Sequence, residues 1–257
     1  MNIALIGYGK TGKEIECAAR EQRHTIAALF TSSQPLPDAP SEFFRSTAID
    51  CFIDFSAPEA VRHNIATAAA LHLPIVVGTT GWQTHFEEFI APIKKENGAL
   101  LYGSNFSVGA QMFLRIVARA SRLFNLFPEY DIAVHETHHR QKKDIPSGTA
   151  LTIAKKILSH VQRKKRITVA GDFSPLQKDD LLISSSRVGS VFGTHRVLFN
   201  SPFDEVELIH QAHNRKGFAC GALLAAEWLQ TKTGIYRFED VISEKINSQQ
   251  QELSIHH

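Results

Sequence analysis

The order of apolar and polar residues along the chain is typical of an α/β protein. In the N-terminal part, short apolar runs of the kind that form buried strands alternate with longer segments whose apolar residues recur at helical spacing. The runs predicted as strands are Asn2–Ile6, Thr25–Phe30, Cys51–Asp54, Ile75–Gly78 and Ala99–Tyr102. Helices are predicted over residues 13–21, 59–71 and 85–96. This alternation predicts a Rossmann-like α/β domain.

The pattern changes in the second part of the chain. A helix predicted over residues 109–124 is followed by a short apolar strand at Asp131–Val134 and by a helix that starts near Thr149. Three runs rich in β-branched or alternating residues then follow, at residues 181–188, 190–199 and 205–211. With residues 131–136, these runs predict a mixed sheet covered by the two helices, an α+β arrangement.

Composition and charge narrow the class of protein. The chain has 257 residues, enough for one large domain or two modest ones, and 43% are hydrophobic and 21% charged, as in a soluble globular protein. The net charge of +2 does not indicate a nucleic-acid partner, and we expect the basic run at residues 163–166 to be a solvated helix end. Because no apolar run is long enough to span a membrane and residue 2 already begins a strand, we predict a cytoplasmic protein.

The cysteines do not indicate a disulfide framework. Cys17, Cys51 and Cys220 are odd in number, widely spaced and flanked by apolar residues. We therefore expect all three to fill the core of a protein in a reducing compartment.

A glycine-rich loop directly follows the first predicted strand. It consists of Gly7, Tyr8, Gly9, Lys10, Thr11 and Gly12, and a helix comes next. Strand, Gly-x-Gly-x-x-Gly and helix in this order are what a dinucleotide site requires, because the glycines allow close approach of a pyrophosphate to the helix N-terminus. The second strand is followed by residues 31–33, Thr-Ser-Ser, and not by the acid that usually reads the ribose of NAD. The sequence therefore favours NADPH over NADH as the cofactor.

The window from His135 to Ala150 concentrates the polar chemistry of the chain. We interpret it as the end of a strand, a loop that carries three histidines and several basic residues, and the start of a helix at Ser147, Gly148 and Thr149. Backbone N–H groups at a helix start favour an anion, so a carboxylate could dock there. The loop could thus hold an acidic substrate beside a titratable proton donor.

A metal site is the alternative for the same window, formed by His135 with His138 or His139. The window lacks a His-Glu-x-x-His pattern and has no cysteine, and its lysines would repel a cation. We predict no metal.

Residues 136–150 resemble the signature of the dihydrodipicolinate reductase family, Glu-x-His-His-x-x-Lys-x-Asp-x-Pro-Ser-Gly-Thr-Ala. The specified positions are here Glu136, His138, His139, Lys142, Asp144, Pro146, Ser147, Gly148, Thr149 and Ala150. The resemblance implies NAD(P)H-dependent reduction of 4-hydroxy-tetrahydrodipicolinate, a cyclic dicarboxylate, with loss of water on the route to lysine and diaminopimelate. It also implies a dinucleotide-binding domain of residues 1–106 and 216–257, and an inserted substrate domain of residues 107–215 whose sheet assembles a homotetramer and which closes with the other domain over the ligands.

The same resemblance implies roles for individual residues. Near the cofactor it places Gly78, Thr79, Thr80, Asn105 and Phe106, and near the substrate it places His139, Lys142, Ser147, Gly148, Thr149 and Arg215. Some family members have an arginine at the position of Ala57, so that cofactor contact does not carry over. We predict His138 and Lys142 as the catalytic residues, with His138 as the proton donor, although residue order alone leaves His139 open.

Two other functions fit parts of the pattern. One is another two-domain reductase of a small amino or keto acid, such as an aspartate or homoserine dehydrogenase. The other is a redox-sensing binding module that holds a dinucleotide without chemistry, but such a module needs a basic or apolar patch for its partner, and the sequence shows neither clearly.

Overall fold

The structure is a computed structural model that describes residues 1–39, 42–171 and 175–255, with side chains up to residue 249. The chain divides into two compact units. Unit 1 comprises residues 1–108 and 215–257, and unit 2 comprises residues 109–214. The sequence of unit 2 is thus inserted into that of unit 1.

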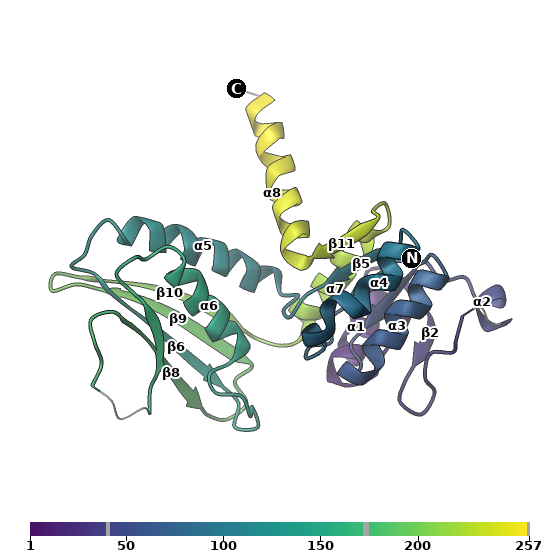
Figure 1. Cartoon of the computed structure of the whole chain (residues 1–257), viewed down its shortest axis with the longest axis horizontal. Coiled ribbons are helices and arrows are strands. Elements are labelled where there is room, and N and C mark those ends of the chain that lie inside the picture. The colour runs from purple at the N-terminus through teal and green to yellow at the C-terminus, as the bar shows by residue number, and fades with distance from the viewer. Residues whose placement is uncertain (40–41, 172–174, 256–257) are drawn as a thin grey trace. The chain divides into compact units, whose positions relative to one another are not determined.

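Unit 1 is built on a parallel sheet of six strands in the order β11-β5-β4-β3-β1-β2 (Figure 1). The strands are β1 (Asn2–Ile6), β2 (Thr25–Phe30), β3 (Cys51–Asp54), β4 (Ile75–Val77), β5 (Ala99–Tyr102) and β11 (Gly234–Arg237). The first five were predicted from the sequence. The edge strand β11 was not predicted, because its four residues form no apolar run. None of the four is fully buried in the structure.

Helices cover both faces of this sheet because each strand is apolar on both sides. Ile3 and Leu5 pack with α1, α7 and α8, whereas Ala4 and Ile6 point to the opposite face and pack with α3 and α4. The helices are α1 (Lys10–Glu21), α2 (Glu42–Ser46), α3 (Pro58–Ala70), α4 (Phe86–Lys95), α7 (Lys216–Leu229) and α8 (Phe238–Ile255), with a short 3₁₀ turn η1 (Gln83–His85). This is the predicted Rossmann-like fold.

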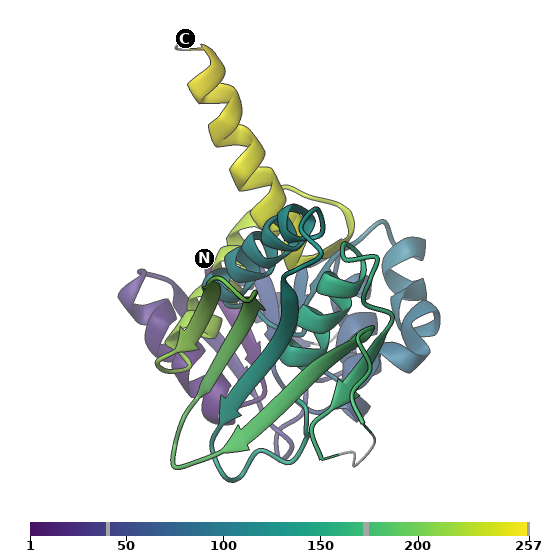
Figure 2. The ribbon, with the colours of Figure 1, turned by 90° about the vertical axis from the view of Figure 1, so that its left-hand side faces the viewer.

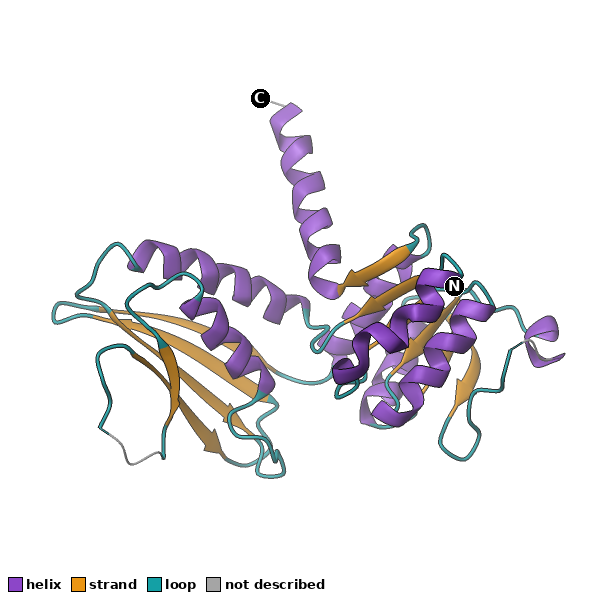
Figure 3. Ribbon diagram, in the orientation of Figure 1, coloured by secondary structure: helices purple, strands orange, loops and turns teal. Residues whose placement is uncertain are grey.

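Unit 2 contains a mixed sheet in the order β10-β9-β6-β8-β7. β6 runs antiparallel to β9 and parallel to β8, and the helices lie on one face of the sheet (Figures 1 and 3). The elements are α5 (Val108–Phe124), β6 (Asp131–His138), α6 (Gly148–Leu158), β7 (Arg166–Val169), β8 (Asp180–Arg187), β9 (Gly193–Asn200) and β10 (Glu205–Ala212). Figure 2 shows the sheet from the side away from α5 and α6. The mixed sheet and its two covering helices agree with the prediction.

Strand β6 is longer than the sequence suggested. We expected the histidines of the window to share a loop, but β6 extends to His138, so His135 and His138 belong to the strand and His139 is the first residue after it. Buried and half-buried positions alternate along β6, and Glu136 and His138 therefore point to the same face as Val134, under the helices. The apolar run ends at Val134, but the β-strand does not.

The structure changes two of the predictions made from composition and charge, those for the basic run and for the cysteines. Lys164 is buried, with its Nζ donating to the carbonyls of Lys178 and Asp180, so the basic run is not a fully solvated helix end. Cys17 is exposed and only Cys51 is fully buried, so the prediction of three core cysteines was wrong for Cys17. Among the described residues, no helix has the length and apolar character needed to span a membrane.

Candidate active site

The glycine-rich loop of unit 1 is shaped by close backbone approaches. Gly7 has a positive φ of 90°, and a Cβ on it would lie 2.4 Å from the Phe55 carbonyl oxygen. A Cβ on Gly12 would lie 2.2 Å from the Gly7 oxygen, so no side chain fits there either. Gly9 is the N-cap of α1, and a Cβ on it would meet nothing within 4 Å. The loop thus leaves open space in front of the α1 N-terminus, where backbone N–H groups favour a phosphate.

Two cavities of unit 1 adjoin this loop. The first, of about 560 Å³, is lined by residues that include Gly7, Tyr8, Gly9, Thr31, Ser32 and Ser33. Its described lining contains no aspartate or glutamate. The second, of about 540 Å³, is lined by residues that include Gly9, Lys10, Thr11, Gly78, Thr79 and Thr80. The structure therefore gathers most of the predicted cofactor residues around one loop.

A buried carboxylate connects the ends of β3 and β4 and contacts two residues that line the second cavity. Asp54 accepts hydrogen bonds at Oδ1 from the Ser56 N–H (2.8 Å) and the Thr79 hydroxyl (3.0 Å), and at Oδ2 from Asn64 (2.9 Å). Burial raises the pKa of Asp54, although these neutral donors act against the rise. The Phe55 ring packs directly against Gly78, since a Cβ on Gly78 would lie 2.2 Å from Phe55 Cζ. Thr79 and Thr80 line the cavity beside it.

The remaining predicted residues of unit 1 have other surroundings. Phe106 is buried and packs against Phe55 and Phe238, with ring centroids 5.7 and 4.9 Å apart. Asn105 accepts the N–H of the residue two positions later, a local turn, and neither Asn105 nor Phe106 is among the lining residues of the two cavities. Arg215 is the N-cap of α7 and belongs to unit 1, one residue beyond the boundary of unit 2.

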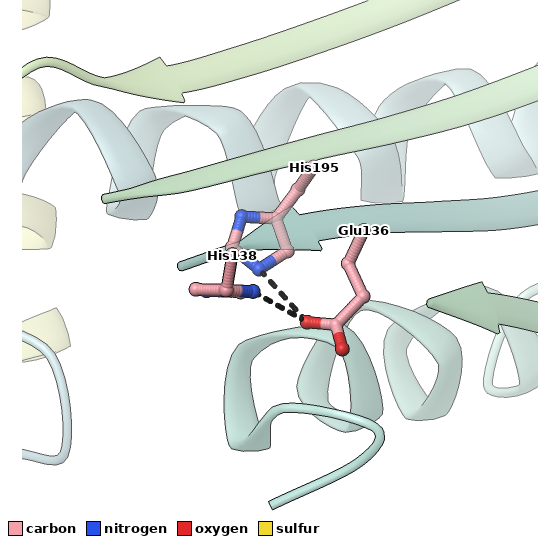
Figure 4. A group of neighbouring side chains, drawn as sticks. All are labelled: Glu136, His138 and His195. Carbon is pink, nitrogen blue, oxygen red and sulfur yellow. Dashed lines mark ion pairs between the residues drawn. The ribbon is translucent and has the colours of Figure 1, made fainter. Parts of the chain in front are cut away.

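In unit 2, polar side chains converge on Glu136, which is fully buried. Its Oε1 accepts hydrogen bonds from the Ser147 N–H (3.1 Å), the Ser185 hydroxyl (2.8 Å) and Arg187 Nη2 (2.9 Å). Its Oε2 lies 3.0 Å from His138 Nδ1 and 4.0 Å from His195 Nε2 (Figure 4). One carboxylate thus joins β6, β8, β9 and the start of α6.

The ionisation of this cluster follows from its contacts. Burial acts to raise the pKa of Glu136, but the hydrogen bonds from His138, Ser147, Arg187 and Ser185 outweigh it and hold the pKa well below its ordinary value. Burial, with the neighbouring His138 as a second cause, lowers the pKa of His195 to about 3. At neutral pH the cluster therefore contains an ionised Glu136 and a neutral His195.

The start of α6 carries part of the predicted substrate site. Ser147 is its N-cap, and the Ser147 Oγ accepts the Ala150 N–H and lies 3.3 Å from His195 Nε2. The Ser147 N–H donates to Glu136 and the Gly148 N–H donates to the Asp144 carboxylate, so an anion at this helix start would have to compete with Asp144 for Gly148. Lys142 Nζ donates to both carboxylate oxygens of Asp144, at 2.8 and 3.1 Å. His139, which follows His138 in the sequence, is half-buried.

A metal ion must be considered because Glu136, His138 and His195 offer donor atoms that all lie within 4.8 Å of one another. His135, which the sequence suggested as a ligand, hydrogen-bonds Ser184 instead (2.8 Å). The charge balance of the cluster does not favour a cation, since Arg187 already neutralises the carboxylate. The absence of a metal stays a prediction.

Sequence reasoning missed Arg187 and Ser185 of this cluster and assigned no role to His195. The signal was present in the alternation of β8, in which Ser185 and Arg187 follow the buried Leu181 and Ile183 at every second position. Pairing β8 with β6 in parallel then places Ser185 beside Glu136. The sequence alone does not predict that β6 pairs with β8.

Comparisons with known proteins agree along the whole chain. Sequence models described as "Dihydrodipicolinate reductase, N-terminus" and "Dihydrodipicolinate reductase, C-terminus" match residues 1–106 and 109–242. The 4-hydroxy-tetrahydrodipicolinate reductase of Christiangramia forsetii is 37% identical, covering 95% of this chain and 98% of the relative. The enzyme of the same name from Natronomonas pharaonis is 35% identical, covering 94% of this chain and all of the relative.

A solved structure shows the same fold. It is that of a dipicolinate-bound dihydrodipicolinate reductase from Paenisporosarcina sp. TG-14, which is 21% identical and has a TM-score of 0.72, covering 93% of this chain and 99% of its own. The two family models and the relatives of similar length confirm what residues 136–150 indicated. This chain belongs to the dihydrodipicolinate reductase family.

Proposed function

We propose that this protein is an NAD(P)H-dependent reductase that converts 4-hydroxy-tetrahydrodipicolinate to tetrahydrodipicolinate, with loss of water, in lysine and diaminopimelate biosynthesis. Relatives that carry this name match the chain over nearly its full length. The structural observation that carries the proposal is the cluster in unit 2, where His138 and Arg187 flank a buried carboxylate at the start of α6. Basic groups around a helix N-terminus suit a small dicarboxylate, the class of ligand bound by the Paenisporosarcina protein.

The cofactor belongs to unit 1 in this proposal. The nicotinamide supplies the hydride, and the protein supplies binding and orientation. The N–H groups of the α1 N-terminus would hold the pyrophosphate beside Gly9, and Thr79 and Thr80 would face the nicotinamide from the second cavity. Asp54 would keep the Thr79 hydroxyl in place from below.

Unit 2 binds the substrate in this proposal. Lys142 and His139 would neutralise the carboxylates of the ring, and the N–H groups of Gly148 and Thr149 would receive one of them. Lys142 would then have to break its ion pair with Asp144 or contact Asp144 and the substrate carboxylate together. As water departs and hydride reaches C4, the ring takes up a proton from His138, because histidine is the side chain that most often transfers protons in enzymes.

NADPH is the cofactor we propose as preferred. Thr31, Ser32 and Ser33 line the first cavity with hydroxyl groups, and no acid in its described lining would repel a 2′-phosphate. Lys10 lines the adjacent cavity and adds a positive charge on the same loop.

We further propose a homotetramer that assembles through the sheet of unit 2. The face of this sheet that α5 and α6 do not cover carries apolar side chains at Ala133, Leu182, Leu198 and Ile209, of which Ile209 is 50% exposed, beside charged residues such as Arg196 and Glu207. Exposed apolar side chains among charged ones on an open sheet face suit contact between subunits. Localisation in the cytoplasm also stays a prediction.

An assay of NADPH oxidation with a panel of substrates tests the reaction against its rivals. We expect turnover with freshly generated 4-hydroxy-tetrahydrodipicolinate and none with oxaloacetate plus ammonia or with aspartate semialdehyde. Turnover of either of the latter alone would favour an aspartate or homoserine dehydrogenase. A protein that binds NADPH but does not oxidise it with any of these substrates would be a binding module.

A further inference from the structure

His138 presents two different nitrogens to its surroundings. Its Nδ1 lies 3.0 Å from Glu136 Oε2, and both side chains are almost entirely buried (Figure 4). An ionised carboxylate only accepts hydrogen bonds, so the nitrogen that faces it carries the hydrogen. The contact therefore selects the Nδ1–H tautomer of the neutral ring and leaves Nε2 for the proton that is exchanged.

The carboxylate that makes this selection is itself held in its ionised form. Three donors point at Oε1, and one of them, Arg187, carries a positive charge. Arg187 is fixed in turn by bonds from Nη2 to the Asp144 carbonyl (2.7 Å) and from Nη1 to the Ser186 carbonyl (2.9 Å). Because all three donors use Oε1, Oε2 is left to the histidines.

The ring of His138 is confined from its other sides by β9. The His195 ring meets it edge to face, with centroids 5.2 Å apart and planes at 73°. Gly193 lies by the other nitrogen, since a Cβ on Gly193 would come within 2.9 Å of His138 Nε2. A side chain at position 193 would press on the nitrogen that the carboxylate leaves available.

We propose that Glu136 is a positioning residue for the reduction: it holds His138 in the Nδ1–H tautomer with Nε2 as the reacting nitrogen, and Arg187 keeps it ionised for this task. This inference rests on the proposed function. Glu136 has no exposed surface and so touches neither ligand. In the reaction the Nε2–H bond of the imidazolium breaks, the proton goes to the substrate ring, and the neutral Nδ1–H imidazole remains against the carboxylate.

Glu136→Gln tests this role, because the amide keeps the size of the side chain and removes its charge. We expect kcat to fall on the order of 10²-fold, with little change in the NADPH dissociation constant. In ¹⁵N spectra of histidine-labelled protein at high pH, the His138 signal, identified by its loss in His138→Gln, should show Nδ1–H in the wild type. Glu136→Gln should shift it towards Nε2–H. Glu129→Gln, an exposed change in unit 2, is the matched control.

The tautomer separates this inference from the proposed function. A wild-type His138 with the hydrogen on Nε2 would overturn the positioning role without any assay, even if Glu136→Gln does not fold. The role is also overturned if Glu136→Gln keeps full kcat, or loses kcat with His138 still as Nδ1–H. A wild type that shows Nδ1–H but turns over no 4-hydroxy-tetrahydrodipicolinate would instead refute the proposed reaction, and with it the role of Glu136 in it.

Discussion

The carboxylates of Asp54 and Glu136 are both fully buried, and their pKa values move in opposite directions. Asp54 accepts hydrogen bonds from neutral groups only, which do not offset its loss of hydration. Glu136 also accepts one from Arg187 and faces His138, so its ionised form is favoured. This difference suits Asp54 to shaping a loop and Glu136 to orienting His138.

Replacing either of the two predicted catalytic side chains tests their roles. His138→Gln removes the proposed proton donor and Lys142→Ala removes a positive charge, so we expect each to lower kcat/KM on the order of 10²-fold. NADPH binding, measured by fluorescence titration, should be retained because neither residue belongs to unit 1. The controls are His160→Gln and Lys155→Ala at other positions of unit 2. Unchanged turnover in both test variants would refute the assignment.

The hydroxyl-lined cavity gives a prediction about cofactor choice. Ser32→Asp places a negative charge where we propose the 2′-phosphate of NADPH, and like charges at short range repel. We expect the ratio of kcat/KM for NADPH to that for NADH to fall about tenfold or more, equivalent to ~1.4 kcal/mol. The measurement is initial rates with each cofactor at saturating substrate. If this ratio of kcat/KM values does not change, the ribose that carries the 2′-phosphate does not bind at Ser32.

At the scale of the elements, the sequence predicted those with a regular apolar period and missed those without one. The strands β1 to β5 are apolar on both sides and were found with nearly the right bounds. The end of β6 was missed because Glu136 and His138 occupy its inward positions, where a strand usually has apolar residues. The candidate site lies at this irregularity, and its partners Ser185 and Arg187 depend on a strand pairing between distant segments.

The pair of strands β7 and β8 carries an acid-sensitive contact. Arg166 and the Gln177 N–H bind the carboxylate of Asp180 and lower its pKa from 3.8 to about 2. Because the folded state holds the lower pKa, the contact stabilises fully above about pH 4, and this stability is lost as the pH falls through about 2. We expect Asp180→Asn to be less stable than the wild type in urea at pH 6, with the difference shrinking below pH 4. A difference independent of pH would contradict this account.

For the whole molecule, the proposed tetramer rests on the uncovered face of the sheet in unit 2. Leu182 and Leu198 lie on either side of Ala133 on this face. A charge there would oppose subunit contact, so we expect Leu198→Glu to convert a tetramer to smaller species in sedimentation velocity. Leu126→Glu, at a site 72% exposed after α5, is the control and should leave the assembly intact. A monomeric wild type, or a tetrameric Leu198→Glu, would argue against this interface.

We propose that hydride passes from a cofactor held by the glycine-rich loop to a cyclic dicarboxylate held by unit 2. Transfer of deuterium tests it most directly. With NADPH deuterated on the transferred position and freshly generated 4-hydroxy-tetrahydrodipicolinate, we predict a tetrahydrodipicolinate that carries one deuterium, detected by mass spectrometry at the rate of NADPH oxidation. Product without the label, or no oxidation of the cofactor in the presence of this substrate, would contradict the account.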